Sequence, residues 1–382
     1  MARRTLRIGI SGSYGGLNLG DEAILEAILA QLRGTVDAHI TVFSRNAEDT
    51  HQRHGVDAIR VSQLNKDEAR EVVASLDLFV LGGGGILYDG GAEIYLRELK
   101  LAQEAGIATM TYAISAGPLE RAESREAVRD VLSATDVVTV RDRPSQKLLE
   151  QTGVDKDITV TADPALLLEP AELPEDALEI EGVDTSRVLV GMSIREPGPA
   201  APDLDVEHHH KVLANAADFM TERFGAHIVF IPMEPTSVDL QHSHAVVAKM
   251  ENAAHATVLK RKYSAGEMLS IVGRFDLAVG MRLHFLIFAA SRGVPFVALP
   301  YASKVGAFLE EMQMPTPPAA AASPGSLIAC IDDRWDNRKA VAAHIHKNFA
   351  PLRERAKETN RLLLQLIETH VQGGARHAAP PA

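Results

Sequence analysis

The sequence predicts an α/β protein built from two Rossmann-like domains that face each other across a cleft. Three observations lead to this prediction. The chain has 382 residues, enough for two domains of ordinary size. Short apolar and β-branched runs alternate with helix-length segments, which is typical of parallel sheets with crossover helices. An acidic, proline-containing stretch at 169–186 divides this pattern into two series.

Each series predicts its strands in order along the chain. The strands expected in the first series are residues 7–11, 39–43, 77–81, 107–113, 136–140 and 157–161. Those expected in the second series are residues 187–194, 227–233, 256–260, 276–280 and 294–300. We therefore expect a first domain over 1–168, a linker over 169–186, a second domain over 187–335, a C-terminal helix over 336–372 and a disordered tail over 373–382. Ligands of such sheets bind beyond the carboxyl ends of the strands, so we expect the functional residues in the loops that follow the strands.

Composition narrows the class of protein. A formal net charge of −12 argues against a nucleic-acid partner, since the phosphate backbone attracts basic proteins. The single cysteine, Cys330, excludes an intramolecular disulfide framework and argues against a cysteine-rich metal site. No apolar run reaches the roughly 20 residues of a transmembrane helix, and the N-terminus lacks a signal-peptide core. We expect a soluble, cytoplasmic protein whose oligomeric state the sequence does not give.

The first expected strand leads into a glycine-rich loop, GSYGGLNLG at 12–20, and then into an amphipathic helix. Glycines at such a place let the backbone turn and approach a ligand. The spacing matches neither G-x-G-x-x-G nor a P-loop, so it does not predict a nucleotide. Asp21 and Glu22 begin the helix, where they either cap it and complement its dipole or supply a carboxylate that acts on a substrate hydroxyl.

A run of four glycines at 82–85 follows the expected strand 77–81 directly. It marks either a sharp turn or a close approach of the backbone to a ligand. Tyr88 and Asp89 come next, and either face a ligand or cap the following helix.

Basic residues follow several expected strands. Arg141 follows 136–140 and Arg195 follows 187–194, at corresponding places in the two series. Arg141 is either one partner of a surface ion pair, with Asp142 or another carboxylate, or part of an anion site that the two arginines hold jointly.

The segment MRLHFLIFAASR at 281–292 predicts a core helix, because it is apolar on nearly every face. Arg282 and His284 in its first turn are expected to be shielded from water and therefore to need partners. Together with the N–H groups of the helix start they form a receptor for a phosphate or carboxylate, although a core histidine is more often hydrogen-bonded to backbone. Lys304 either reaches the same rim or is a solvated loop lysine.

Three successive histidines at 208–210, and His242 with His244, lack the spacing of metal ligands. Adjacent helical residues point about 100° apart, so they chelate poorly. We expect the triplet to be a solvated helix start and expect no metal in the protein.

An ordered set of segments resembles the polysaccharide pyruvyl transferase family, most closely its bacterial cell-wall (CsaB-like) branch. The segments are GLNLGDEAIL (16–25), LGGGGILYD (81–89), VVTVRD (137–142), TADPALLL (161–168), GMSIR (191–195), VFIPM (229–233), GMRLHFLIFAASRGVPFVAL (280–299) and YASKV (301–305). The resemblance implies a GT-B-like fold with the acceptor on the N-terminal domain and the donor on the C-terminal domain. The chain has AISAGP, YASKV and LGGGGILYD where the family usually has G-Q-G-I-G-P, Y-D-P-K-V and S-G-G-G-S-L-L-Q-D. These departures concern the acceptor more than the donor.

The resemblance also implies the chemistry. Family members transfer the pyruvyl group of phosphoenolpyruvate to two hydroxyls of a sugar, forming a cyclic ketal and releasing phosphate. No metal and no cofactor beyond this donor substrate is implied. The other partner is a glycan of the cell wall or an exopolysaccharide. A lipid-linked acceptor would bring the enzyme to the inner face of the plasma membrane.

Residues matching the family's motifs receive these roles. The donor site is expected at Arg141, Arg282, His284 and Lys304, to which the position of Arg195 after its strand adds a fifth member. The acceptor side or its loops are expected to include Asn18, Gly20, Gly83, Gly84 and Asp89. His284 is expected to protonate the leaving phosphate, while Asp21 or Glu22 accepts the proton of the attacking hydroxyl. The alternatives are a GT-B-type sugar-nucleotide glycosyltransferase and a non-catalytic module that binds a glycan or phosphate.

Overall fold

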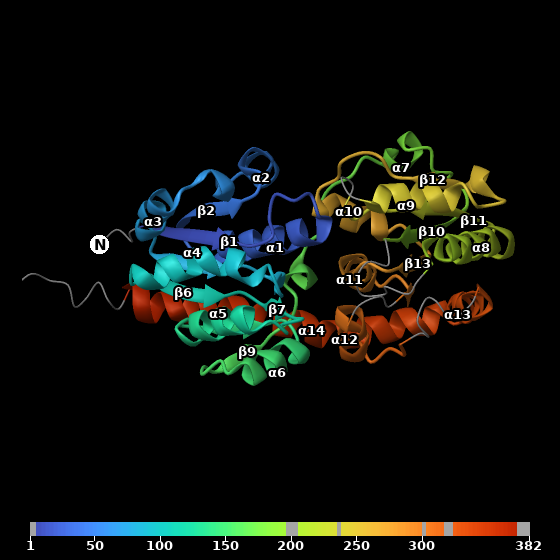
Figure 1. Ribbon diagram of the computed structural model, residues 1–382. Helices are drawn as coiled ribbons and strands as arrows, with labels where there is room; N and C mark the ends of the chain where they lie inside the picture. The colour runs from blue at the N-terminus through green and yellow to red at the C-terminus, as the bar shows by residue number, and fades with distance from the viewer. Residues whose placement is uncertain (1–4, 196–204, 235–237, 300–302, 317–323, 373–382) are drawn as a thin grey trace, which may run out of the picture. The chain divides into compact units, whose positions relative to one another are not determined.

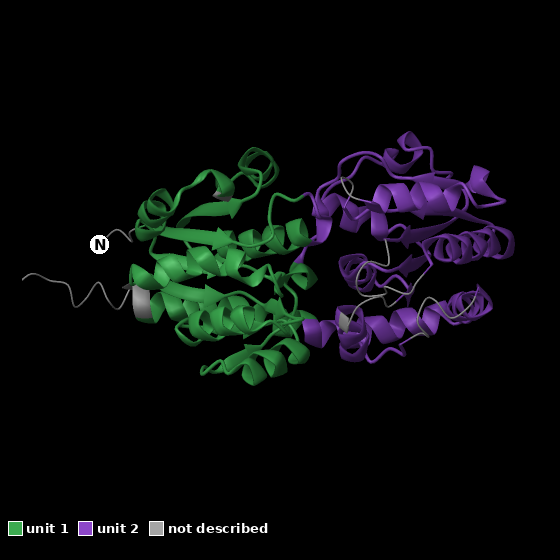
Figure 2. Cartoon of the chain, in the orientation of Figure 1, with its two compact units in different colours: residues 1–16, 21–167, 353–382 green, residues 17–20, 168–352 purple. Residues whose placement is uncertain are grey.

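The computed structural model describes residues 5–195, 205–234, 238–299, 303–316 and 324–372 (Figure 1). The chain divides into two compact units, shown in different colours in Figure 2. Unit 1 comprises residues 1–16, 21–167 and 353–382, and unit 2 comprises residues 17–20 and 168–352. Each unit is an α/β fold with parallel strands, so the predicted fold class is confirmed.

Unit 1 is built on parallel strands that pair in two groups, β3-β2-β1-β4-β6 and β5-β7-β8-β9. The bounds of these strands are β1 Leu6–Ser11, β2 Ala38–Ser44, β3 Asp57–Arg60, β4 Leu78–Leu81, β5 Gly84–Leu87, β6 Ala108–Thr111, β7 Ile114–Ala116, β8 Val138–Val140 and β9 Ile158–Val160. The inner strands are apolar and buried on both faces, as helices on both sides of a parallel sheet require.

The two groups form one continuous layer, because β4 leads into β5 and β6 leads into β7 after two residues each. The amide of Thr111 donates to the carbonyl of Val137 (3.0 Å), which ties β6 to the strand that becomes β8. The combined order is β3-β2-β1-β4/β5-β6/β7-β8-β9. The direction of winding reverses between β1 and β4, and that reversal is where doubly wound sheets bind ligands.

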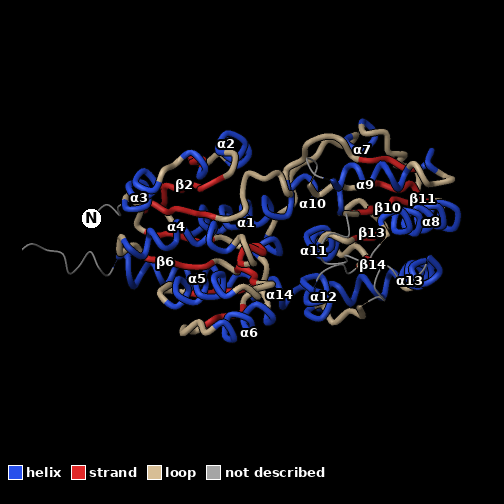
Figure 3. Tube along the Cα trace, viewed as in Figure 1, coloured by secondary structure: helices blue, strands red, loops and turns tan. Residues whose placement is uncertain are grey.

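Helices alternate with these strands along the chain (Figure 3). Those of unit 1 are α1 Leu19–Thr35, α2 Ala47–His54, α3 Lys66–Ala74, α4 Ala92–Glu104, α5 Ala122–Ser133, α6 Arg143–Thr152 and the end of α14 Arg338–Leu366. Leu96 and Leu99 of α4 enter the same apolar core as Phe79 of β4 and Val128 of α5. Burial of this apolar surface holds the layers together.

Unit 2 repeats the pattern with five parallel strands in the order β12-β11-β10-β13-β14. Its strands are β10 Val188–Ser193, β11 Ala226–Phe230, β12 Ala256–Val258, β13 Leu277–Gly280 and β14 Phe296–Ala298. Its helices are α7 Ala177–Ile180, α8 Val206–Phe224, α9 Val238–Val247, α10 Ala265–Val272, α11 Leu283–Ser291, α12 Ser303–Glu311, α13 Pro324–Asp336 and the start of α14. Here the winding reverses between β10 and β13.

Every expected strand is present, and several end earlier than predicted. Three strands were missed: β3, β5 and β7. The glycine run at 82–85 is more than a turn, because Gly84–Leu87 pair with β7 as strand β5. Helix α11 is buried on nearly every face, as predicted for a core helix.

The segment predicted as a linker is folded against unit 2. The amide of Ala171 donates to Gly266 (3.0 Å), and the carboxylate of Glu181 accepts from the amides of Lys260 (3.1 Å) and Arg261 (2.9 Å). Glu181, one of the acidic residues that suggested a linker, therefore binds backbone amides just before α10. Residues 169–186 belong to unit 2, whose main segment begins at Leu168.

The predicted C-terminal helix is present as α14, but it does not form a separate element. Its end belongs to unit 1, where Thr359 Oγ1 lies 2.8 Å from Thr161 Oγ1 and Arg355 Nε donates to the Thr161 carbonyl (2.8 Å). The predicted tail, 373–382, lies outside the described residues. None of the described helices combines the length and apolar composition needed to cross a membrane.

Candidate functional site

The carboxyl ends of β1 and β4 bring the first set of predicted residues to one edge of unit 1. The loop after β1 leads to Asp21 and Glu22 in the first turn of α1, and the loop after β4 contains Gly83 and Gly84. Arg141 follows β8 at the same edge of the layer. We call Asp21, Glu22, His54, Arg141 and Asp163 the N-terminal cluster.

Glu22 is buried, with 1% of its surface exposed, and both its oxygens are occupied. Oε1 accepts from the amide of Gly15 (2.9 Å), and Oε2 lies 2.9 Å from Nε2 of His54, the last residue of α2. The sequence did not indicate this partner, because His54 is 32 residues away along the chain. The carboxylate therefore holds the loop after β1.

Asp21 lies beside it in a more open position, half-buried in the first turn of α1. Its Oδ1 is 3.5 Å from the point that a Cβ on Gly84 would occupy, and Gly84 has a φ of +105°. Asp21 thus borders the glycine run after β4.

Gly83, within the glycine run, and Asp89, just after it, both contact backbone groups of neighbouring loops. A Cβ on Gly83 would lie 3.0 Å from the carbonyl oxygen of Tyr112. The carboxylate of Asp89 accepts from the amides of Glu120 (2.8 Å) and Arg121 (3.1 Å), just before α5. These contacts favour the turning and capping interpretation for both residues.

Arg141 is buried, with 7% exposed, and is paired with two carboxylates. Nη1 lies 2.9 Å from Oδ2 of Asp163, which follows β9, and Nε lies 3.4 Å from Oδ2 of Asp142. Nη2 is 3.9 Å from the Cβ position of the exposed Gly85. The ion pair that the sequence gave as one alternative for Arg141 is therefore present. Nη2 of its guanidinium lies toward the glycine run at 82–85.

Two buried tyrosines, which the sequence gave no reason to select, lie under this edge. Tyr14 and Tyr112 are fully buried, and neither hydroxyl has a hydrogen-bond partner among the described residues. Burial raises the pKa of both, and the carboxylates of Asp21 and Glu22 add to the effect at Tyr14. Both hydroxyls are protonated at neutral pH.

Unit 2 carries a second group at the reversal of its own sheet, which we call the C-terminal cluster: Arg195, Glu234, Asp239 and Arg282. Arg282 is the N-cap residue of α11, directly after β13. Its Nε donates to Oδ2 of Asp239 (3.0 Å), its Nη2 to Oδ1 of Asp239, and its Nη2 also to Oε2 of Glu234 (2.9 Å). The partners that burial was predicted to require are present.

Asp239 anchors this cluster from the first turn of α9 and has no exposed surface. Burial raises the pKa of its carboxyl, while the guanidinium of Arg282 opposes the rise. Arg195, half-buried after β10, also lowers that pKa through its charge. Arg195 and Arg282, predicted from separate strands, thus share Asp239 as an electrostatic partner.

Residues 17–20 belong to unit 2 and contribute Asn18 and Gly20. Oδ1 of Asn18 accepts from the amide of Gly20 (2.9 Å) at the start of α1. A Cβ on Gly20 would lie only 2.0 Å from Nδ1 of His284, so the imidazole sits where any other residue would place its side chain. His284 is half-buried in the first turn of α11, and Lys304 is exposed near the start of α12.

The histidine triplet differs from the prediction. His208 is exposed, but His209 and His210 are 2% and 5% exposed. Nε2 of His210 lies 2.6 Å from Nδ1 of His242 on α9, because α8 packs against α9. The prediction of a solvated helix start was therefore wrong for two of the three residues, His209 and His210. No group of three or more metal-ligating side chains is placed to hold a metal within the described ranges.

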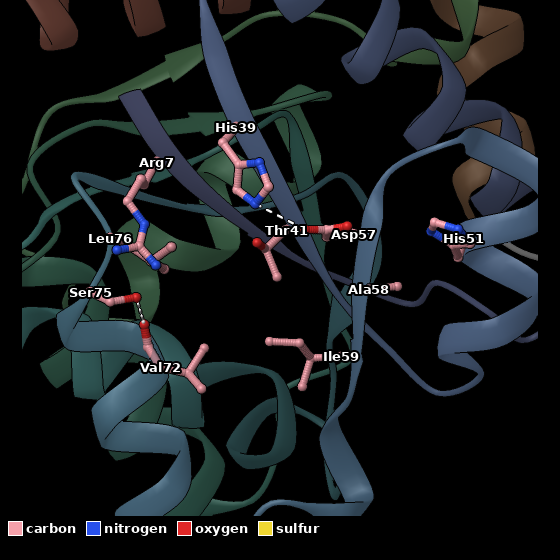
Figure 4. Close-up of a pocket in the computed structure, with 10 residues that line it drawn as sticks. All are labelled: Arg7, His39, Thr41, His51, Asp57, Ala58, Ile59, Val72, Ser75 and Leu76. Atoms are coloured by element: carbon pink, nitrogen blue, oxygen red, sulfur yellow. Dashed lines mark hydrogen bonds and ion pairs between the residues drawn. The ribbon is translucent and has the colours of Figure 1, made fainter. Parts of the chain in front are cut away.

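Two hollows lie elsewhere in unit 1. The first, of about 430 Å³, is lined by Arg7, His39, Thr41, Asp57 and neighbouring residues, with His39 Nε2 2.9 Å from Asp57 Oδ2 (Figure 4). The second, of about 510 Å³, includes Asp77 and Asp136. Both occupy the amino ends of the strands, opposite to the edge where doubly wound sheets bind ligands. We therefore do not assign the predicted site to either hollow.

Solved structures with a similar course of the chain support the two-domain, GT-B-like fold. A putative UDP-N-acetylglucosamine 2-epimerase from Listeria monocytogenes matches with a TM-score of 0.67 at 11% identity, over 96% of this chain and 97% of that one. A glycosyltransferase from Rickettsia africae matches with a TM-score of 0.62 at 12% identity, over 96% and 99%. The UDP-GlcNAc 2-epimerase from Neisseria meningitidis, bound to UDP-GlcNAc, matches with a TM-score of 0.61 at 11% identity, over 94% and 99%. At such identities the likeness concerns the fold alone.

Sequence comparison gives the family. No curated protein matches the chain. The sequence profile of the polysaccharide pyruvyl transferases matches residues 18–303, most of the chain, from Asn18 past His284. The chain belongs to the polysaccharide pyruvyl transferase family.

Proposed function

We propose that the protein transfers the pyruvyl group of phosphoenolpyruvate to two hydroxyls of a glycan sugar, forming a ketal and releasing phosphate. One observation carries the proposal: in a chain of this family, basic side chains follow the strands at the winding reversal of unit 2 and at the corresponding edge of unit 1. Phosphoenolpyruvate carries a carboxylate and a phosphate, and both suit guanidinium donors.

The carboxylate partners fit this role. Arg141 and Arg282 are each held by acidic side chains, so their guanidinium groups are fixed before a ligand arrives. Pre-organised donors lose little freedom on binding. Much of their charge is already compensated, so the exposed Lys304 and the half-buried Arg195 and His284 supply further positive character.

The proposed reaction proceeds in two additions. Protonation of the methylene carbon makes the central carbon of phosphoenolpyruvate electrophilic, and the first sugar hydroxyl attacks it while a base removes the hydroxyl proton. The second hydroxyl then displaces phosphate and loses its proton to the base, while phosphate leaves with a proton from a general acid. The two protons lost by the hydroxyls balance those gained by the methylene carbon and by phosphate. We assign the acid to His284 and the base to Asp21, because Asp21 is half-buried whereas Glu22 is only 1% exposed and holds the loop after β1. The scheme uses no metal or further cofactor.

The acceptor we propose first is an N-acetylmannosamine unit of a lipid-linked cell-wall precursor, as expected for the bacterial cell-wall (CsaB-like) branch. A galactose or glucose unit of an exopolysaccharide comes second. A lipid-linked acceptor would place this cytoplasmic enzyme at the inner membrane face.

Phosphate release tests the proposal. The protein is incubated with phosphoenolpyruvate and defined glycosides, lipid-linked and free. Released phosphate is quantified, and the mass of the glycoside product is determined by mass spectrometry. His284→Ala and Lys304→Ala are expected to lower turnover at least about 100-fold. The exposed residues His208 and Lys347 provide matched controls, His208→Ala and Lys347→Ala. A sugar nucleotide such as UDP-GlcNAc serves as the alternative donor, and its consumption in place of phosphoenolpyruvate would overturn the proposal.

A further inference from the structure

The amide of Gly15, the carboxylate of Glu22 and the imidazole of His54 form a continuous chain of hydrogen bonds, which we call the loop latch. The two distances are both 2.9 Å. Glu22 and His54 are 1% and 7% exposed, so water does not compete for these bonds. A buried carboxylate is costly unless donors surround it, and here one donor is in the loop and the other on α2.

The loop packs closely against the segment that joins β2 to α2. Gly15 has a φ of +73°, and a Cβ there would lie 2.2 Å from Oγ of Ser44 and 2.6 Å from the amide of Asn46. The amide of Arg45 donates to the carbonyl of Tyr14 (3.1 Å) from the same segment. The loop after β1 is therefore pressed against the residues that begin α2, and Glu22 ties it to the far end of that helix.

We propose that His54 is a positioning residue, which acts through Glu22 to hold residues 12–17 of the loop after β1 in the shape needed for the transfer reaction. Glu22 serves the latch and is not the general base. The role of the loop in catalysis rests on the proposed function, whereas the latch itself does not.

Asp21 depends on the latch because it neighbours Glu22 in the first turn of α1. Adjacent helical side chains point about 100° apart, so the buried Glu22 fixes the rotation of the helix start and leaves Asp21 on another side. Asp21 lies by Gly84 on that side. Loss of the latch should thus loosen the loop and the start of α1 together.

Hydrogen exchange measures the latch without reference to activity. In His54→Leu the carboxylate of Glu22 loses one of its two donors, and the amides of residues 12–17 are expected to exchange at least about tenfold faster than in the wild type. His54→Gln, whose side-chain amide still donates, is expected to restore most of the protection. His208→Leu, at an exposed histidine of unit 2, is the control and is expected to leave the loop unchanged.

Turnover measures the separate question of the base. Glu22→Gln keeps an oxygen for the Gly15 amide, so its loss of kcat is expected to be at least about tenfold smaller than that of Asp21→Asn, which falls at least about 100-fold. A 100-fold loss in Glu22→Gln with normal loop exchange would overturn our assignment of Glu22.

The two possible failures are distinguishable. Unchanged exchange of residues 12–17 in a folded His54→Leu protein would reject the latch, whatever the activity. If His54→Leu does not fold, Glu22→Leu in a His54→Leu background removes the buried charge as well, and slow loop exchange in that folded double variant would also reject it. If no pyruvyl transfer is found with any acceptor, the proposed function fails, and the exchange experiment still decides the latch.

Discussion

Replacing His209 by leucine is expected to stabilise unit 2 at acidic pH. The imidazole is buried in the first turn of α8, and neither ring nitrogen has a hydrogen-bond partner among the described residues. Burial, together with the nearby His210, His242 and His208, lowers its pKa to about 4. The folded protein therefore holds this ring neutral, while the ring of the unfolded chain titrates near 6.5.

The sign and size of the effect follow from this difference. Between pH 6.5 and pH 4 the unfolded chain binds the proton more readily, so acidification favours unfolding. The stability is complete above pH 6.5 and is lost as the pH falls toward 4. The full difference corresponds to about 3 kcal/mol, of which about 2 kcal/mol is lost by pH 5. His210, whose pKa is also lowered, adds to the loss in the same direction.

The single tryptophan of the chain provides the assay. Trp335 stacks on Phe224 at the end of α8, with ring centroids 4.3 Å apart, so its fluorescence reports the unfolding of unit 2. Urea denaturation at pH 7.5 and pH 5 is expected to show a loss of about 2 kcal/mol in the wild type and a clearly smaller loss in His209→Leu. His208→Leu, at the exposed neighbour, should behave as the wild type. An equal loss of stability in His209→Leu and in the wild type between these pH values would show that His209 does not cause the acid sensitivity.

Three further substitutions have defined outcomes. Asp239→Ala leaves Arg282 without its buried carboxylate and is expected to cost about 3–5 kcal/mol in the Trp335 urea assay; a loss below about 1 kcal/mol would contradict this. Gly84→Ala places a side chain at a φ of +105° and is expected to lower the free energy of unfolding by at least about 1 kcal/mol, read by calorimetry, where an unchanged midpoint speaks against strain. Arg141→Met removes the charged partner of the buried Asp163 carboxylate and is expected both to destabilise the chain by about 3 kcal/mol and to abolish phosphate release, so full activity would remove Arg141 from the site.

Much of the fold was predictable, because buried parallel strands are continuous apolar runs that stand out between helical segments. The three strands that were not predicted, β3, β5 and β7, lack such runs. β3 reads DAIR and is only partly buried at the edge of its sheet, and β5 begins with two glycines. β7 has three residues and is defined by its neighbours β5 and β8. Their strand character comes from pairing, which a local sequence pattern does not contain.

The candidate site was predictable in one respect. A residue that follows a buried strand must emerge at the sheet's carboxyl edge, so Arg141, Arg195 and Arg282 were placed correctly after their strands. Their carboxylate partners were not, because Asp163 and Asp239 lie on other loops, 22 and 43 residues away.

The same limit applies to single residues. Glu22 and Asp21 look alike in the sequence, and only the position of His54 separates the buried one from the open one. The histidine triplet looked like a solvated helix start, until the approach of α9 placed His242 against His210. Contacts between distant segments decide such cases.

The proposed transfer of a pyruvyl group from phosphoenolpyruvate to a glycan can be tested by measuring both products of the reaction. Phosphate release and acceptor mass are followed together in a reaction containing phosphoenolpyruvate and a lipid-linked N-acetylmannosaminyl acceptor, with the galactose- and glucose-containing glycosides in parallel. We expect one phosphate for each acceptor that gains a pyruvyl ketal, and neither product in His284→Ala. Phosphate released without a change in acceptor mass, or an acceptor extended only when a sugar nucleotide is supplied, would contradict it.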